Sequence, residues 1–110
     1  MSYTVTAHKG AFIIRMLVDR LDSHNSPALK LELKRLADRR PTTVIVDLTG
    51  VRFVDPNGLA ALLAGDHFAA LCGCRIRVAG LSPDVHTLFA LAQVDRVLAI
   101  FPTEREALGE

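Results

Sequence analysis

Two aspartates frame the most distinctive stretch of the sequence. Asp47 follows the apolar run Val44–Val46, and Asp55 stands directly before Pro56. A pair of carboxyl groups could serve as general acid and general base. A structural explanation also accounts for both, because aspartates accept hydrogen bonds from loop backbone and cap the first turn of a helix, where a following Pro fits well. The sequence therefore favours structural roles for this pair over catalysis.

A second set of residues could bind a metal. Its members lie close together in the chain and are Asp66, His67, Cys72 and Cys74. Their spacing matches no common zinc pattern, and the remaining histidines stand in predicted turns or at a predicted helix start. The chain also lacks a glycine-rich phosphate loop and a nucleophile elbow. We therefore expect a binding protein rather than an enzyme, with no metal and no cofactor.

The overall composition narrows the class of protein further. The 110 residues are 50% hydrophobic with a net charge of +1, which predicts one folded domain, residues 1–110. A nucleic-acid binder normally carries a basic excess, which is absent here. No apolar run approaches the roughly 20 residues of a membrane span, and the first ten residues do not resemble a signal peptide. We expect a cytoplasmic protein.

The first half of the chain predicts a hairpin followed by a helix. Residues 3–7 and 11–18 are expected to form two strands joined by a turn. After a polar loop at 19–25, the pair Ser26-Pro27 is expected to cap a helix that ends near residue 40. The apolar residues of this helix follow helical spacing and form one buried stripe: Leu29, Leu33, Leu36 and Ala37.

The middle of the chain predicts a buried strand, a short apolar segment at 51–54 and a helix at 56–71. The β-branched run that begins at Val44 is typical of a strand covered on both faces. The helix that follows has apolar residues at nearly every angle around its axis. It is either buried all round or presents an apolar surface of small residues to a partner, and we favour the second interpretation.

The last third predicts a strand at 75–79, a helix over 82–92, a strand at 97–101 and a terminal helix that begins with a capping box of Thr103 and Glu106. The element order is then ββαβαβαβα. Strand–helix–strand units of this length imply right-handed parallel crossovers, and the opening hairpin makes the sheet mixed. The predicted fold class is α/β.

The segment VIVDLTGVRFVDPNGLAALL, residues 44–63, resembles the signature of the STAS domain found in bacterial anti-sigma-factor antagonists. That signature is a strand ending in Asp-Leu-Ser/Thr, an apolar piece, and Asp-Ser-Ser/Thr-Gly-Leu at a helix start. Residues 20–22 are similar to the Glu-Leu-Asp of the family, and residues 80–108 are similar to its closing helix, strand and helix. The resemblance covers essentially the whole chain and implies the same element order.

The resemblance implies a protein that docks on an anti-sigma factor, commonly a serine kinase, and so frees a sigma factor. The kinase inactivates its antagonist by phosphorylating a Ser or Thr at the start of the second helix, and the added charge disrupts docking. Here Pro56-Asn57 replaces the usual hydroxyl residues, and Asn57 aligns with the phosphoacceptor. An amide cannot be phosphorylated, so we hypothesise an antagonist that is not switched at this position.

Two other modifications remain open. Ser23 resembles a second phosphorylation site of some STAS proteins, although we favour the interpretation that it is an ordinary loop serine that bonds to backbone. Asn57-Gly58 is a sequence that can deamidate, which a helical backbone should disfavour. The partner surface is expected to comprise the 22–25 loop, the start of the second helix and outward residues of that helix: Asp22, Ser23, His24, Asn25, Asp55, Pro56, Asn57, Gly58, Ala61 and Gly65.

Two alternatives to the antagonist interpretation stay open at this point, and so does the oligomeric state. The chain could be a STAS adaptor or subunit in a stress-signalling or lipid-transport assembly. It could also bind a small ligand or nucleotide at the helix start, although Arg52 is the one positive side chain close to Asp55 in sequence. Its oligomeric state could be a monomer or a weak homodimer.

Overall fold

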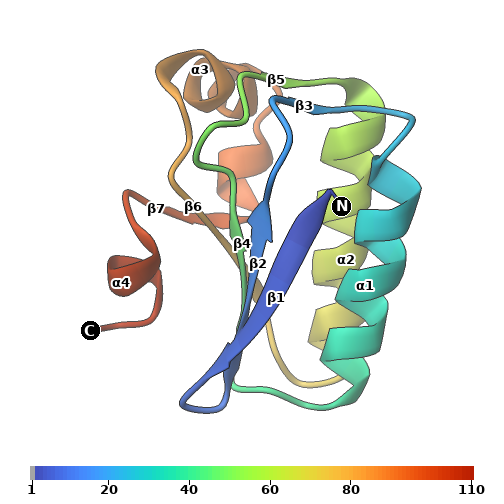
Figure 1. Ribbon diagram of the computed structural model, residues 1–110, viewed down its shortest axis with the longest axis vertical. Coiled ribbons are helices and arrows are strands. Elements are labelled where there is room, and N and C mark those ends of the chain that lie inside the picture. Colours follow the sequence, from blue (N-terminus) through green and yellow to red (C-terminus); the bar gives the residue numbers. More distant parts are fainter. Residues whose placement is uncertain (1) are drawn as a thin grey trace.

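A five-stranded mixed β-sheet forms the centre of the molecule (Figure 1). The computed structural model describes residues 2–110, and the strands of this sheet are β1 Tyr3–His8, β2 Ala11–Met16, β4 Val44–Asp47, β6 Ile76–Ala79 and β7 Ala99–Phe101. They lie in the order β1-β2-β4-β6-β7. β1 and β2 are antiparallel, and all other neighbours are parallel. The expected α/β fold with a mixed sheet is confirmed.

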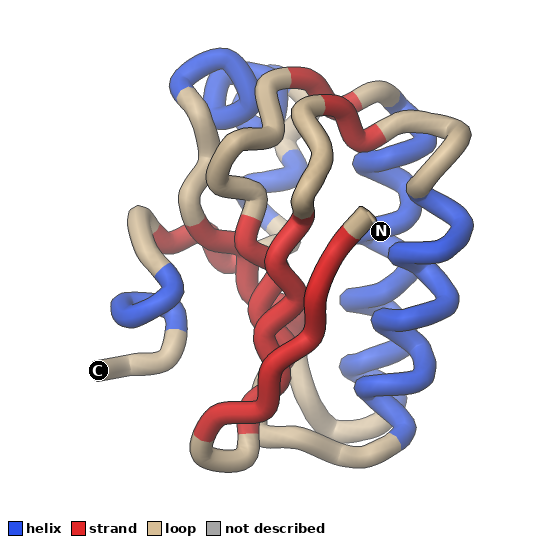
Figure 2. The backbone as a smooth tube through the Cα atoms, viewed as in Figure 1, coloured by secondary structure: helices blue, strands red, loops and turns tan. Residues whose placement is uncertain are grey.

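The two faces of the sheet are covered unequally (Figure 2). The helices are α1 Ser26–Asp38, α2 Pro56–Leu71, α3 Pro83–Leu91 and α4 Glu104–Ala107, with a 3-10 turn η1 at Val94–Arg96. α1 and α2 lie side by side on one face, and α3 contributes Val85 and Phe89 to the same core cluster. The short α4 covers the other face with Ala107. The larger core therefore lies between the sheet and α1, α2 and α3.

The central strand β4 has the burial that its sequence predicts. Val44, Ile45 and Val46 are fully buried. Because side chains alternate across a strand, Val44 and Val46 face the larger core while Ile45 faces α4. The apolar run without alternation is thus explained by helices on both faces.

The packing of α2 differs from our expectation. Ala61 and Gly65 were expected to point outward, and that orientation is wrong, because both are buried against α1. A Cβ atom added to Gly65 would lie 3.0 Å from Leu33 Cβ and 3.2 Å from Leu33 Cγ, and closer still to Leu33 Cδ1. Small residues on α2 thus allow the two helices to approach closely, and α2 keeps an exposed apolar side at Ala60 and Ala70.

Two elements near the top of Figure 1 were not predicted. Arg20–Leu21 forms β3 and Phe53–Val54 forms β5, and the two pair in parallel as a separate small sheet.

The start of α1 also differs from the prediction, since the N-cap residue is Asn25 and not Ser26. The Asn25 side chain makes no cap hydrogen bond, because both of its polar atoms are engaged in the preceding loop.

Candidate functional site

The N-terminus of α2 is shaped by one carboxylate. Asp55 Oδ1 accepts a hydrogen bond from Gly58 N at 2.9 Å, and Pro56 occupies the first turn without needing a partner for its nitrogen. The hydrogen bond from the Gly58 N–H lowers the pKa of Asp55, with smaller contributions from the Asn57 and Ser23 N–H groups. The predicted capping role of Asp55 is therefore confirmed.

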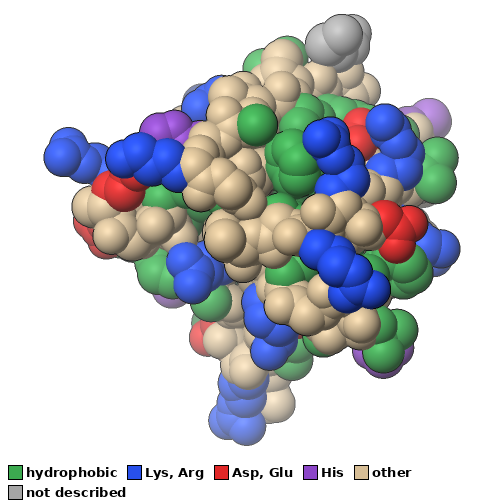
Figure 3. Space-filling view, turned by 90° about the horizontal axis from the view of Figure 1, so that it is seen from below, with side chains coloured by type: hydrophobic (Ala, Val, Ile, Leu, Met, Phe, Trp, Pro, Cys, Tyr) green, Lys and Arg blue, Asp and Glu red, His purple; other side chains and the backbone are tan. Residues whose placement is uncertain are grey.

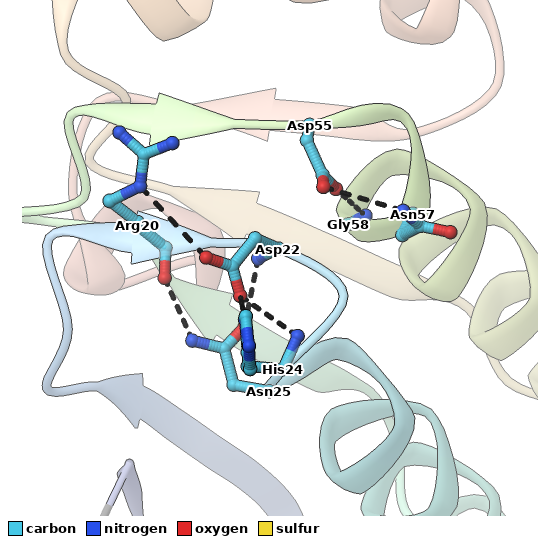
Figure 4. A network of polar contacts seen from close by, with 7 residues as sticks. All are labelled: Arg20, Asp22, His24, Asn25, Asp55, Asn57 and Gly58. Atoms are coloured by element: carbon cyan, nitrogen blue, oxygen red, sulfur yellow. Dashed lines mark hydrogen bonds and ion pairs between the residues drawn. The ribbon is translucent and has the colours of Figure 1, made fainter.

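Asn57 lies on the exposed surface of this first turn. Its Nδ2 donates to Asp55 Oδ2 at 3.4 Å, and its amide oxygen points away from Asp55 (Figure 4). The amide side chain is thus held near the cap and offers neutral donor and acceptor groups to the solvent.

The loop at 22–25 is closed by its own side chains. Asp22 Oδ1 accepts from His24 N at 2.9 Å, and Asn25 Oδ1 accepts from Asp22 N at 2.9 Å. Asn25 Nδ2 donates to the carbonyl oxygen of Arg20 at 2.8 Å. Ser23 is exposed at the tip of this loop. The predicted loop residues therefore form one connected network, which Figure 4 shows beside the start of α2.

Gly58 joins the loop to the helix by close packing. Asp55 N donates to the carbonyl oxygen of Leu21 at 3.0 Å. A Cβ atom at Gly58 would lie 2.8 Å from that same oxygen and 2.9 Å from Val54 Cγ1. Gly58 is buried, so it positions the site rather than contributing surface to it. Our expectation that Gly58 belongs to the partner surface is corrected accordingly.

The residues considered for catalysis and metal binding have separate partners. Asp47 Oδ1 accepts from Thr49 Oγ1 at 2.7 Å and from Thr49 N at 2.9 Å, as its structural role predicts. Burial raises the pKa of Asp47, and a hydrogen bond with Glu104 raises it further. Asp47 and Glu104 both lie on the side of the sheet that α4 covers, together with Arg15, which holds the Glu104 carboxylate by two hydrogen bonds.

The metal candidates likewise form no cluster. Asp66 is only 3% exposed, and its oxygens accept from Arg75 Nε at 3.0 Å, Arg75 Nη2 at 2.8 Å and Ile76 N at 3.0 Å. His67 is exposed, while Cys72 and Cys74 are free thiols at the end of α2. Within residues 2–110, no group of three potential ligands is arranged to hold a metal ion.

The polar network of the 22–25 loop and the start of α2 lies at one end of the molecule. At the opposite end, which Figure 3 views, Lys and Arg side chains are spread among apolar and neutral ones. None of the helices within residues 2–110 combines the length and apolarity that crossing a membrane requires.

Comparison with known proteins identifies the fold family. The model of the STAS domain matches residues 2–107. The chain belongs to the STAS domain family. This STAS domain is 27% identical over 104 residues to the anti-sigma F factor antagonist of Paenibacillus polymyxa, covering 94% of this chain and 88% of the relative.

Solved structures agree with this assignment of the fold. An anti-sigma factor antagonist from Mycobacterium paratuberculosis superimposes with a TM-score of 0.85 at 22% identity, covering 97% of this STAS domain and 90% of that chain. The Bacillus cell fate determinant SpoIIAA in its phosphorylated form gives a TM-score of 0.73 at 19% identity, covering 97% and 96%. At these identities the likeness establishes the fold.

Proposed function

We propose that this STAS domain is an anti-sigma factor antagonist, which binds an anti-sigma factor and thereby releases a sigma factor. The observation that carries the proposal is the exposed, rigidly capped start of α2 beside the closed 22–25 loop. The curated relative from Paenibacillus polymyxa, whose name states this activity, supports it. The protein acts by binding rather than by catalysis, without a cofactor, in the cytoplasm.

The proposed docking surface comprises the exposed and partly exposed residues of the loop and of the start of α2. It includes Asp22, Ser23, His24, Asn25, Asp55, Pro56 and Asn57. Ala61 and Gly65 are left out, because both are buried against α1. The surface is thus smaller than the sequence suggested.

We further propose that docking is not switched by phosphorylation at Asn57. A phosphoryl group would add about −1.5 to −2 charges at the centre of this surface. The amide of Asn57 accepts no phosphoryl group, so position 57 stays neutral. If the partner is a serine kinase, the exposed hydroxyl of Ser23 is the alternative acceptor within the same surface.

A capture experiment tests the docking surface. Wild-type protein and the Asn57→Asp variant are used as baits in native extract, and retained proteins are identified by mass spectrometry. The new carboxylate lies at a helix N-terminus, where negative charge is favourable, so the variant should remain folded. We expect an anti-sigma factor on the wild-type bait and its loss on Asn57→Asp.

The control places the same charge elsewhere on the helix. Ala70→Asp adds a carboxylate to the exposed side of α2, about 20 Å along the helix from Asn57, and should retain the anti-sigma factor. If the Asn57→Asp variant also retains the anti-sigma factor, Asn57 is not part of the interface. Retention of transport or scaffold proteins in place of an anti-sigma factor would support the adaptor function instead.

The kinase question needs a separate assay with the captured anti-sigma factor and ATP. A kinase-type partner should phosphorylate an Asn57→Ser variant at the restored hydroxyl and leave the wild type unmodified at position 57. Phosphate on Ser23 of the wild type, lost in Ser23→Ala, would show that the switch has moved to the loop. Absence of phosphate from the Asn57→Ser variant would argue against a kinase-type partner.

A further inference from the structure

A groove lies between the N-terminal halves of α1 and α2, directly beside Asn57. Its volume is about 260 Å³, and it is lined by Ser26, Pro27, Lys30, Asn57, Ala60 and Ala61. We refer to it as the α1–α2 groove. It is smaller than the roughly 300–1,000 Å³ of typical ligand pockets, so it suits one side chain rather than a cofactor.

The charge at this groove is positive and uncompensated. Lys30 is the one charged residue among those that line it, and it is exposed. Among residues 2–110, no carboxylate forms an ion pair with Lys30. The nearby Asp55 already accepts hydrogen bonds from Gly58 N and Asn57 Nδ2. The ammonium group of Lys30 can therefore form an ion pair with a carboxylate of a partner protein.

The next turn of α1 continues the same charge. Lys34 follows Lys30 by four residues and so lies on the same side of the helix. Its Nζ sits 5.1 Å from the centre of the Phe68 ring of α2. The exposed groups of α2 along this side are apolar or neutral apart from His67. The α1–α2 groove thus has Lys30 on its α1 border, with Lys34 one turn beyond it, and neutral residues on its α2 border.

We propose that the α1–α2 groove binds an Asp or Glu side chain of the anti-sigma factor, with Lys30 Nζ and the Asn57 amide as donors. The inference rests on the proposed function and adds to it the chemistry of the partner. Two features support this occupant: the groove adjoins the proposed docking surface through Asn57, and its unpaired cation is complementary to a carboxylate. Asn57 Nδ2 keeps one N–H beyond the one directed at Asp55.

The same arrangement explains how charge at position 57 would act. A carboxylate or phosphoryl group at that position would lie in the groove with Lys30 and pair with it. The carboxylate of the partner would then lose its cation and meet a like charge. Docking would therefore weaken by competition for Lys30 as well as by repulsion. In this interpretation Lys30 is a specificity-determining residue for the partner.

The test uses the anti-sigma factor identified with the wild-type bait, purified and titrated by calorimetry at two salt concentrations. Lys30→Gln should weaken binding about tenfold and Lys30→Glu about a hundredfold, as expected for a close interfacial charge pair. The wild type should also lose more affinity at high salt than Lys30→Gln does. The matched controls Arg105→Gln and Arg105→Glu change an exposed cation on α4, at the opposite face of the sheet, and should bind as the wild type does.

A charge exchange identifies the partner group. One Asp or Glu of the anti-sigma factor, when changed to Lys, should restore binding to Lys30→Glu and should weaken binding to the wild type and to both Arg105 variants, which keep Lys30. Lys30 is exposed, so its variants should keep the wild-type unfolding curve. Wild-type affinity in Lys30→Glu, with Asn57→Asp still inactive, would overturn this inference and leave the proposed function standing. Failure of the wild type to bind any anti-sigma factor would overturn both.

Discussion

Replacing Gly65 by Ala tests whether this residue packs between helices or faces a partner. Gly65 lies in the middle of α2, and an added Cβ would be 3.0 Å from Leu33 Cβ and 3.2 Å from Leu33 Cγ. Leu33 is fully buried, so any movement that makes room for the methyl group has to displace other core side chains. If Gly65 faced solvent, the same change would only remove the flexibility of glycine.

Two opposing contributions determine the expected change in the free energy of unfolding of Gly65→Ala. Gly→Ala within a helix stabilises the folded state by about 1 kcal/mol. Forcing a methyl group into a filled core costs about 1–3 kcal/mol, and the upper half of that range applies because the contact includes the rigid Cβ of Leu33. We expect a net loss of about 1–2 kcal/mol, or about 4–8 °C in Tm for a domain of this size.

Urea unfolding followed by circular dichroism measures this difference. Ala60→Gly, on the exposed side of the same helix, calibrates the contribution of helix propensity and should cost about 1 kcal/mol. In a Leu33→Ala background the contacts with Leu33 Cγ and Cδ1 are removed while the contact with Cβ remains, so the loss caused by Gly65→Ala should become smaller. A gain of about 1 kcal/mol from Gly65→Ala in the wild-type background would refute the close α1–α2 contact.

Two further predictions concern charges and the helix cap. Arg15 lowers the pKa of Glu104 to about 2 from the ordinary 4.5, so this ion pair stabilises the fold fully above pH 4.5 and loses its effect as the pH falls toward 2. Glu104→Gln should therefore lower the free energy of unfolding at pH 7, and its difference from the wild type should shrink below pH 4.5. A difference from the wild type that does not change with pH would contradict this. Asp55→Ala should speed deamidation of Asn57, because it frees the Gly58 N–H that cyclisation requires. Asp55→Asn keeps the cap and should deamidate as slowly as the wild type. Equal deamidation rates for Asp55→Ala and the wild type in intact-mass time courses would show that the cap does not protect Asn57.

Local signals in the sequence were sufficient for the main elements of the fold. The β-branched run at Val44–Val46 predicted a doubly covered strand, and β4 lies in the middle of the sheet. The two-residue strands β3 and β5 were missed, because a strand this short shows no periodicity and its pairing joins residues more than thirty positions apart. Their formation depends on tertiary contacts that no local pattern records.

The site was predicted in part for a similar reason. Asp55 before Pro56 is a strong local cap signal, and the structure has that cap. The inward face of α2 could not be inferred, since Ala and Gly occur at nearly every angle around the helix and the position of Leu33 on α1 decides which side is buried. Lys30 carried no signal of its own, because only the packing of α1 on α2 brings it to the groove beside Asn57.

The small β3–β5 sheet bears on how quickly and how tightly a partner can bind. It ties the segment before the 22–25 loop to the segment before α2, while Asp55 N bonds to Leu21 across them. Loops that must become ordered on binding lose conformational entropy, which reduces affinity. Here that ordering has already taken place during folding. We therefore expect association without a slow rearrangement step, and the free and bound protein should have nearly the same backbone at this end.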